Sequence, residues 1–401
     1  MFNRNDKRNE LRAALNAGDP YALAKVFKIL TVSPNKSPSE PNPPSSKEPL
    51  NENGVDFTNV AKLLMEANEY ASHGYAVKSY DAQASLHAAF NQAFGSSSGN
   101  WLVPSMQAVC KTTHVLAVAA DKEAASADNA RLQNAVTLLQ ESFSRTFNDR
   151  KELRPEDPLN DTDGSKKVGV LYIVNELFSI YFSLNTLRLC KNLVRPVESR
   201  NLHTAGSLGD MVTYRYYTGR LNLFEDQYAE AETNLEYAFK HCHKDAIHNK
   251  KLILRYLVPV KLYRGRLPSV NLLAKYQLLE FAPLVDSIRK GDLKTFNDTV
   301  NLCQDRFIRQ GTFLLVEKCK TVCYRNLFKR LCLVMQKNQI PLSVPQKALD
   351  SMGMRMDVDE IECILANLIY NGYLRGYIAH NKRYLVLSKL DPFPVSAVIP
   401  K

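Results

Sequence analysis

DVDEIECILANLIYNGYLRGYIAHNKRYLVL, the sequence of residues 357–387, contains the most regular pattern of the chain. The carboxylate of Asp357 can accept the free backbone amide of Glu360 while Glu360 reaches back, which predicts a capping box at a helix start. The apolar positions that follow are spaced three and four residues apart, as the inward face of a helix requires. These positions are Val358, Ile361, Ile364, Leu365 and Leu368. Asn371-Gly372 predicts the end of this helix, because glycine accepts the left-handed conformation of a C-cap.

A two-stranded ribbon is predicted directly after the capped helix. Its strands are expected at 374–379 and 383–387, joined through His380-Asn381-Lys382. Upstream of the capped helix, the pattern indicates a helix, a short strand and a second helix. The order helix, strand, helix, capped helix and ribbon is the outline of a winged helix, a fold that either reads DNA or docks proteins.

The capped helix carries the wrong charge for reading DNA. In a DNA reader this helix would enter the groove, but here it opens with Asp357, Asp359 and Glu360. Three carboxylates would repel phosphate instead of releasing counterions. We therefore expect this helix to dock a protein, and any nucleic acid to be held elsewhere.

Length and composition indicate an ordinary globular chain with two or three domains. It has 401 residues, of which 45% are hydrophobic, enough to bury a real core. The start, 1–10, has no apolar segment, and the longest apolar stretch, near 168–189, is interrupted by polar residues. We therefore expect neither the usual secretion route nor a membrane span. Eight cysteines without a Cys-x-x-Cys pair predict reduced thiols in a nuclear or cytosolic protein, and no metal site.

The net charge of +11 belongs to the C-terminal half of the chain. Residues 1–210 hold 23 Lys and Arg against 23 Asp and Glu, so their charges cancel. Residues 211–401 hold 29 Lys and Arg against 18 Asp and Glu, which is the whole surplus. A polyanionic partner is therefore expected to contact the C-terminal half.

Two runs of cations within that half are nearly free of acid. Residues 246–279 contain seven cations and no carboxylate, and residues 306–347 contain nine cations against Glu317 alone. A single charge run is often only a solvated face. Two such runs followed by a basic ribbon favour nucleic-acid contact. The cations of the ribbon are Arg375, Lys382 and Arg383.

The region from residue 210 has the pattern of a helix-turn-helix repeat, with Gly219 as a close-packing glycine. Ala231, Leu235 and Ala238 follow it 12, 16 and 19 residues later, which are the offsets of a tetratricopeptide repeat. The predicted fold is therefore mainly α: an α-solenoid of tetratricopeptide-like helical hairpins followed by a C-terminal winged helix. The next helices are expected at 247–262, 269–289, 292–307 and 311–336.

The sequence pattern divides the chain into six parts. A segment with six prolines between 33 and 54 predicts a linker, because its composition cannot bury enough surface to fold. Gly291-Asp292 predicts a turn and a helix start inside the repeats. The parts are a short N-terminal helical segment at 1–32, a Pro- and Ser-rich linker at 33–55, N-terminal helical repeats at 56–209, further helical repeats at 210–323, a winged helix at 324–392 and a tail at 393–401.

The sequence contains no motif for catalysis. There is no glycine-rich phosphate loop, no Gly-x-Ser-x-Gly and no His-Glu-x-x-His pattern. Helical solenoids mostly present binding surfaces, so we expect a non-catalytic protein with no cofactor and no small-molecule substrate. Tyr214, Tyr216 and Tyr217 span more than one helix face, which favours core packing over base stacking.

Five stretches carry a resemblance to a known family. They are SKKVGVLYIVNELFSIYFS (165–183), DMVTYRYYTGRLNLFE (210–225), NKKLILRYLVPVKLYRGR (249–266), YRNLFKRL (324–331) and DEIECILANLIYNGYLRGYIAHN (359–381). An α-solenoid that ends in a winged helix resembles the PCI domain, the assembly module of the proteasome lid, the signalosome and a translation-initiation factor. Within that family, the chain looks like the PCI subunit of the nuclear transcription-and-export complex (TREX, second type). The likeness runs from about residue 56 to the end, and the Pro-rich insert departs from it.

The resemblance implies a scaffold in the nucleus, associated with the nuclear pore, with some cytoplasmic protein. The partners that it implies are a large helical scaffold subunit of the GANP/Sac type and a small acidic subunit of the Sem/DSS type. The assembly would contact the sugar-phosphate backbone of RNA or DNA, without choice of base. Carried onto this sequence, that contact falls on Lys318, Lys320, Lys329, Arg330, Arg375, Lys382 and Arg383.

A second interpretation is open at this point. In it, the chain is a signalosome-like PCI assembly subunit whose cations meet acidic protein partners only. Binding to single-stranded RNA that falls steeply with salt favours the export interpretation. Co-purified signalosome subunits favour the other.

Overall fold

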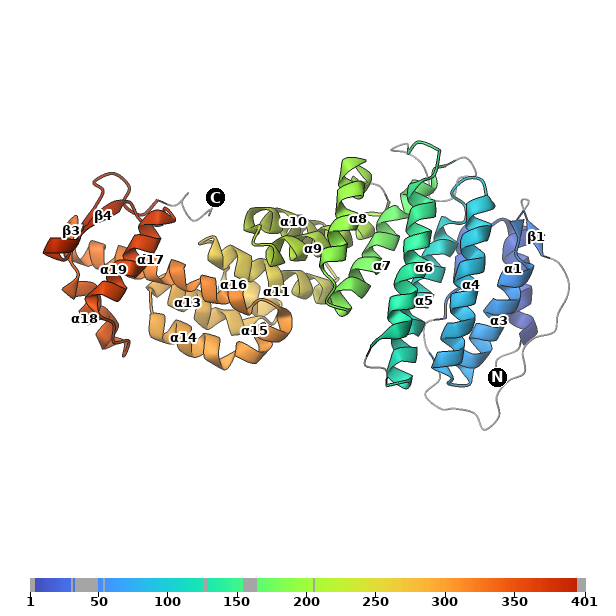
Figure 1. The fold of residues 1–401 in the computed structure, drawn as a ribbon, viewed down its shortest axis with the longest axis horizontal. Helices are drawn as coiled ribbons and strands as arrows, with labels where there is room; N and C mark the ends of the chain where they lie inside the picture. The colour runs from blue at the N-terminus through green and yellow to red at the C-terminus, as the bar shows by residue number, and fades with distance from the viewer. Residues whose placement is uncertain are drawn as a thin grey trace. The chain divides into compact units, whose positions relative to one another are not determined.

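The structure is a computed structural model that describes residues 4–29, 32, 50–52, 55–125, 128–153, 164–204 and 206–394. It divides into two compact units, Met1–Tyr217 and Thr218–Lys401, and the division falls inside helix α9 (Leu208–Phe224). Both units are mainly helical (Figure 1). Among the described helices, none has the length and apolar content that crossing a lipid bilayer requires.

The N-terminal unit consists of helices that pack against their neighbours in the sequence. In Figure 1, α3, α4, α5 and α6 lie side by side, and each packs against the next. Helix α5 packs against both α4 and α6, which also pack against each other, and its residues Val109, Leu116 and Ala117 are fully buried. The helices that precede α9 are α1 Arg4–Ala17, α2 Pro20–Val26, α3 Thr58–Ser72, α4 Ala76–Ser96, α5 Val103–Glu123, α6 Ala130–Phe147, α7 Val170–Ser183 and α8 Arg188–Ser199, with the 3-10 helices η1 Lys166–Gly169 and η2 Leu202–Thr204.

The predicted linker and the predicted tail lie largely outside the described residues. Of the linker, 33–49 and 53–54 are outside, while β1 (Asn51–Glu52) pairs antiparallel with β2 (Val55–Asp56). Of the tail, 395–401 are outside. Phe393 is buried, and its carbonyl accepts a 2.8 Å hydrogen bond from the guanidinium of Arg325.

The C-terminal unit begins with the predicted helical hairpin. A Cβ atom added at Gly219 in α9 would lie 2.7 Å from Leu235 Cγ in α10, so the close-packing role of this glycine is confirmed. Ala231, Leu235 and Ala238 are fully buried, as the repeat pattern predicts. The helices after α9 are α10 Tyr228–His241, α11 Ile247–Tyr263, α12 Val270–Lys275, α13 Ala282–Lys290, α14 Leu293–Leu302, α15 Gln304–Gln310, α16 Phe313–Lys318 and α17 Lys320–Met335, with the 3-10 helix η3 Leu279–Phe281 between α12 and α13.

Three predicted helices of this unit are each broken in two. The prediction at 269–289 was wrong because Gln277 takes a positive φ of 53°, which ends α12. The predictions at 292–307 and 311–336 are interrupted at Cys303 and Cys319, where one helix ends and the next begins. The predicted turn at Gly291-Asp292 is confirmed: Gly291 has a φ of 70°, and Asp292 Oδ1 accepts the amide of Thr295 at 3.0 Å.

The winged helix is present with the predicted order of elements. The capping box is confirmed, since Asp357 accepts the Glu360 amide at 2.7 Å and its own amide donates to Glu360 Oε2 at 3.1 Å. Gly372 ends the capped helix with a φ of 74°. The elements are β3 Gln339–Pro341, α18 Ser343–Ser351, α19 Val358–Tyr370, β4 Gly376–Ala379, the 3-10 helix η4 His380–Lys382 and β5 Tyr384–Leu387.

The three strands of the winged helix form one antiparallel sheet in the order β3-β5-β4. Ile340, Leu385 and Leu387 are buried on its inner face. On β5, side chains alternate between the two faces, so Tyr384 and Val386 belong to the outer face. The inner face of the sheet thus completes the core, while the outer face carries the exposed Tyr377 and Tyr384.

Candidate interaction surfaces of the C-terminal unit

The seven predicted nucleic-acid contacts lie in two regions of the C-terminal unit. Lys318 is the last residue of α16, and three further predicted contact residues lie on α17. The other three belong to the wing, which we define as residues 374–387. In the wing, Arg375 precedes β4 while Lys382 and Arg383 lie at the turn between β4 and β5, at the opposite end of the ribbon. The structure also engages several of the seven in ion pairs within the chain. The residues on α17 are Lys320, Lys329 and Arg330, and those in the wing are Arg375, Lys382 and Arg383.

Lys318 is bound to the start of α10. Its ammonium donates to Asp226 Oδ1 and to Tyr228 Oη, both at 2.9 Å. Burial opposes the charge, yet these two bonds raise the pKa of Lys318. The bond from Lys318 in turn lowers the pKa of Asp226. Lys318 therefore already has an anionic partner within the chain, with which a phosphate group would have to compete.

Arg383 binds the wing to helix α19. Its guanidinium donates to Asp359 and to Glu362 Oε1, the latter at 3.3 Å, while His380 Nδ1 lies 2.7 Å from Glu362 Oε2. The hydrogen bond from Arg383 lowers the pKa of Asp359, and the same bond raises the pKa of Arg383. The acidic start of α19 is thus partly neutralised by the wing of the same chain.

The remaining predicted cations differ in how freely they present their charge. Arg375 lies 3.5 Å from Asp391, and both side chains are more than half exposed, so water and salt weaken this pair. Within the described residues, the other four have no ion-pair partner. These four are Lys320, Lys329, Arg330 and Lys382.

The outer face of the sheet forms a groove of about 560 Å³ beside Lys382. Tyr377 is 62% exposed and Tyr384 is 39% exposed, and both line the groove. Tyr377 is directly opposite Val386 in the strand register, and Ala379 is opposite Tyr384, which places all four on one face. Exposed aromatic rings next to a lysine are the combination that holds single-stranded nucleic acid without base choice.

The two tyrosines were missed by sequence reasoning. The signal that could have found Tyr377 is the alternation of side chains along β4, in which Tyr377 is exposed while its neighbours Gly376 and Ile378 are partly buried. Only the pairing of β4 with β5 places Tyr384 on the same face. The prediction of core packing for the tyrosines of α9 holds for Tyr214, which is fully buried with its ring 5.9 Å from that of Phe178, while Tyr216 and Tyr217 are half-buried.

The acid-free run at 246–279 is partly neutralised in three dimensions. Arg264 and Arg266 both lie 2.9 Å from the buried carboxylate of Glu232, which belongs to α10. Lys261 pairs with Glu236 on the same helix. A run of cations in the sequence therefore overstates the unpaired charge, because carboxylates of a neighbouring helix form ion pairs with some of these cations.

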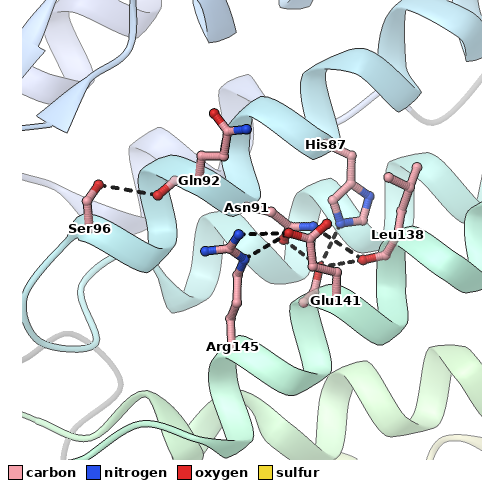
Figure 2. Close-up of polar contacts among 8 residues, drawn as sticks. His87, Asn91, Gln92, Ser96, Leu138, Glu141 and Arg145 are labelled. Atoms are coloured by element: carbon pink, nitrogen blue, oxygen red, sulfur yellow. Dashed lines mark hydrogen bonds and ion pairs between the residues drawn. The ribbon is translucent and has the colours of Figure 1, made fainter.

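The cysteine and histidine in the core of the N-terminal unit do not form an active site. His87 and Cys110 are fully buried, and Cys110 Sγ lies 3.9 Å from His87 Nε2. Burial raises the pKa of the Cys110 thiol and so disfavours a nucleophilic thiolate. Figure 2 shows His87 between α4 and α6 beside Asn91, whose amide donates to the carbonyl of Leu138. The arrangement is a hydrogen-bonded core.

Comparison with known proteins agrees with this architecture of helical hairpins and winged helix. The sequence model of the PCI domain matches residues 284–389. PCI domain-containing protein 2 of Danio rerio is 37% identical over 337 residues, 84% of this chain and 83% of the relative. The protein of the same name in Xenopus laevis is 35% identical over 333 residues, 82% of this chain and 81% of the relative. Protein CSN12 homolog of Neurospora crassa is 31% identical over 382 residues, 84% of this chain and 82% of the relative.

The fold and its surfaces define a PCI-domain protein, a class of helical scaffold subunits. The chain belongs to the PCI domain-containing protein 2 family.

Proposed function

We propose that the chain is a non-catalytic scaffold subunit of a nuclear, transcription-coupled mRNA-export complex. Its helical hairpins and winged helix dock protein partners, and its basic C-terminal half, including α17 and the wing, holds RNA or DNA without choice of base. The observation that carries the proposal is the groove of the wing, where Tyr377, Tyr384 and Lys382 adjoin without a carboxylate in the lining.

The protein partners that we propose are a helical scaffold subunit of the GANP/Sac type and a small acidic subunit of the Sem/DSS type. The net charge of +11, all of it in residues 211–401, suits an acidic partner. Such partners place the chain in the nucleus at the nuclear pore. The acidic first turn of α19 favours a protein partner at this helix start, because Asp357 and Glu360 cap the helix and would repel a phosphate backbone.

The nucleic-acid contact is tested by titrating the purified protein with fluorescent single-stranded RNA and measuring anisotropy. We expect Tyr377→Ala to weaken binding about tenfold, since stacking of one base contributes roughly 1–3 kcal/mol. Lys382→Glu is expected to weaken binding to every sequence alike and to flatten the salt dependence. Tyr370→Ala, which removes an 88% exposed tyrosine of α19 outside the groove, is the matched control. Equal binding by all four proteins would contradict a nucleic-acid site in the wing.

A second candidate function is a signalosome-like assembly subunit with only protein partners. The ion pairs of Lys318, Arg375 and Arg383 favour it, because three of the seven predicted contacts already have a carboxylate partner within the chain. Absence of RNA binding by the wild-type protein, alone and in complex with its partners, would select this function.

A further inference from the structure

Cations from both acid-poor runs converge on a second pocket of the C-terminal unit. The pocket has a volume of about 600 Å³ and is separate from the groove of the wing. Helix α11 contributes Lys251 and Arg255, and α15 contributes Arg306 and Arg309. The two residues of α11 precede the two residues of α15 by more than 50 positions in the sequence, so only the fold brings the two pairs together.

The pocket has a surplus of positive charge. Among its lining residues, Glu280 is the one carboxylate, and it lies 3.3 Å from Arg306. Lys251 donates to the neutral amide oxygen of Gln277 at 3.2 Å, and Arg309 donates to the backbone carbonyl of Asp305. Three of the four cations therefore have no carboxylate partner among the described residues, which leaves a formal surplus of three charges.

Two buried polar atoms of the lining residues lack hydrogen-bond partners. They are Nε of Arg255 and Oε1 of Gln310, and neither has a partner among the described residues. A buried donor or acceptor without a partner is costly, roughly 1–3 kcal/mol. Arg255 Nε is a donor, so an anion in this positively charged pocket supplies the acceptor that it lacks, whereas Gln310 Oε1 is an acceptor and does not bear on an anionic ligand.

We propose that this pocket binds a compact, multiply phosphorylated anion. Three guanidinium groups and one ammonium surround a volume typical of small-ligand sites, and guanidinium groups match phosphate oxygens in pairs. No aromatic side chain lines the pocket, so bases of a nucleic-acid strand would find no stacking surface there. The proposal is independent of the function of the wing.

Isothermal titration of the purified chain with inorganic tripolyphosphate at physiological salt tests the proposal. We expect saturable binding of one tripolyphosphate per chain, weakened at least tenfold by Arg255→Ala and by Arg309→Glu. Arg309 is exposed, so its variant keeps the test valid if the half-buried Arg255 is needed for folding. The matched control Lys294→Ala with Lys347→Ala removes two exposed cations outside the pocket and should bind as the wild type does.

Two outcomes would overturn the proposal. One is absence of saturable binding, or equal affinity of wild type, Arg255→Ala and Arg309→Glu for tripolyphosphate. The other is weakened binding of single-stranded RNA by Arg309→Glu with tripolyphosphate binding unaffected, which would assign the pocket to nucleic acid instead.

Discussion

His87 shows at the scale of one residue how the core of the N-terminal unit depends on a neutral side chain. Its Nδ1 lies 2.9 Å from Thr113 Oγ1 and its Nε2 lies 2.8 Å from Ser142 Oγ. All three residues are fully buried. Burial lowers the pKa of His87 to about 3, because the charged ring would lose its solvation by water.

This shift of the His87 pKa predicts acid sensitivity of the N-terminal unit. The unfolded chain binds a proton near pH 6.5 and the folded chain only near pH 3, so stability falls as pH falls between these values. At pH 5 the loss is roughly 2 kcal/mol relative to pH 7. Urea unfolding at both pH values measures it. In a His87→Gln variant the difference should shrink by about that amount, and an unchanged difference would refute the assignment.

Charge pairing at single residues is the part of the site that the sequence could not predict. The surplus in residues 211–401 follows from counting, but the partners Asp226 of Lys318 and Asp359 of Arg383 are 92 and 24 positions away. Pairing at such distances depends on the packing of α10, α16, α19 and the wing. The sequence therefore predicted where the positive charge is, but not which of it is free.

Gly291 sets the turn between α13 and α14 at the scale of elements. We expect Gly291→Ala to destabilise the C-terminal unit by about 2–4 kcal/mol, because its φ is positive and the new Cβ would lie 2.5 Å from Leu327 N. Gly353→Ala is the matched control, since its φ is also positive but nothing lies within 4 Å of the new Cβ. It should cost about 1 kcal/mol. Urea unfolding of both variants measures the difference, and equal costs would contradict the close approach.

The capping box of α19 gives a second prediction at this scale. Asp357→Ala should destabilise the winged helix by about 1 kcal/mol, because the amide of Glu360 loses its acceptor. Asp357→Asn keeps an acceptor and should cost much less. Hydrogen exchange of the amides in 358–362 reports the change locally. Identical exchange in both variants would show that the cap does not hold the helix start.

The elements themselves were predicted well where local chemistry decides them. The cap at Asp357, the stop at Gly372 and the ribbon are local signals, and the structure contains all three. The pairing of β3 with β5 was not predicted, because it joins residues more than 40 positions apart. The breaks at Gln277, Cys303 and Cys319 also lack a glycine or proline signal and arise from packing.

At the scale of the whole molecule, the number of free cations predicts how salt weakens RNA binding. Four of the seven predicted contacts have no ion-pair partner among the described residues. For a single-stranded ligand, each contact contributes about −0.7 to the slope of log affinity against log salt concentration. The expected slope is about −3, or a loss of about 50-fold in affinity between 50 and 200 mM salt. Engagement of all seven would give about −5. Anisotropy titrations across that salt range distinguish the two, and a slope near zero would exclude an electrostatic contact.

The central claim, that the chain is a docking scaffold, is tested most directly by measuring which proteins co-purify with it and in what amounts. Tagged protein is purified from nuclear extract at physiological salt after ribonuclease treatment, and the co-purified proteins are quantified by mass spectrometry. The account predicts a helical scaffold subunit and a small acidic subunit in amounts close to that of the chain itself. Recovery of the chain alone, without any stoichiometric protein partner, would contradict it.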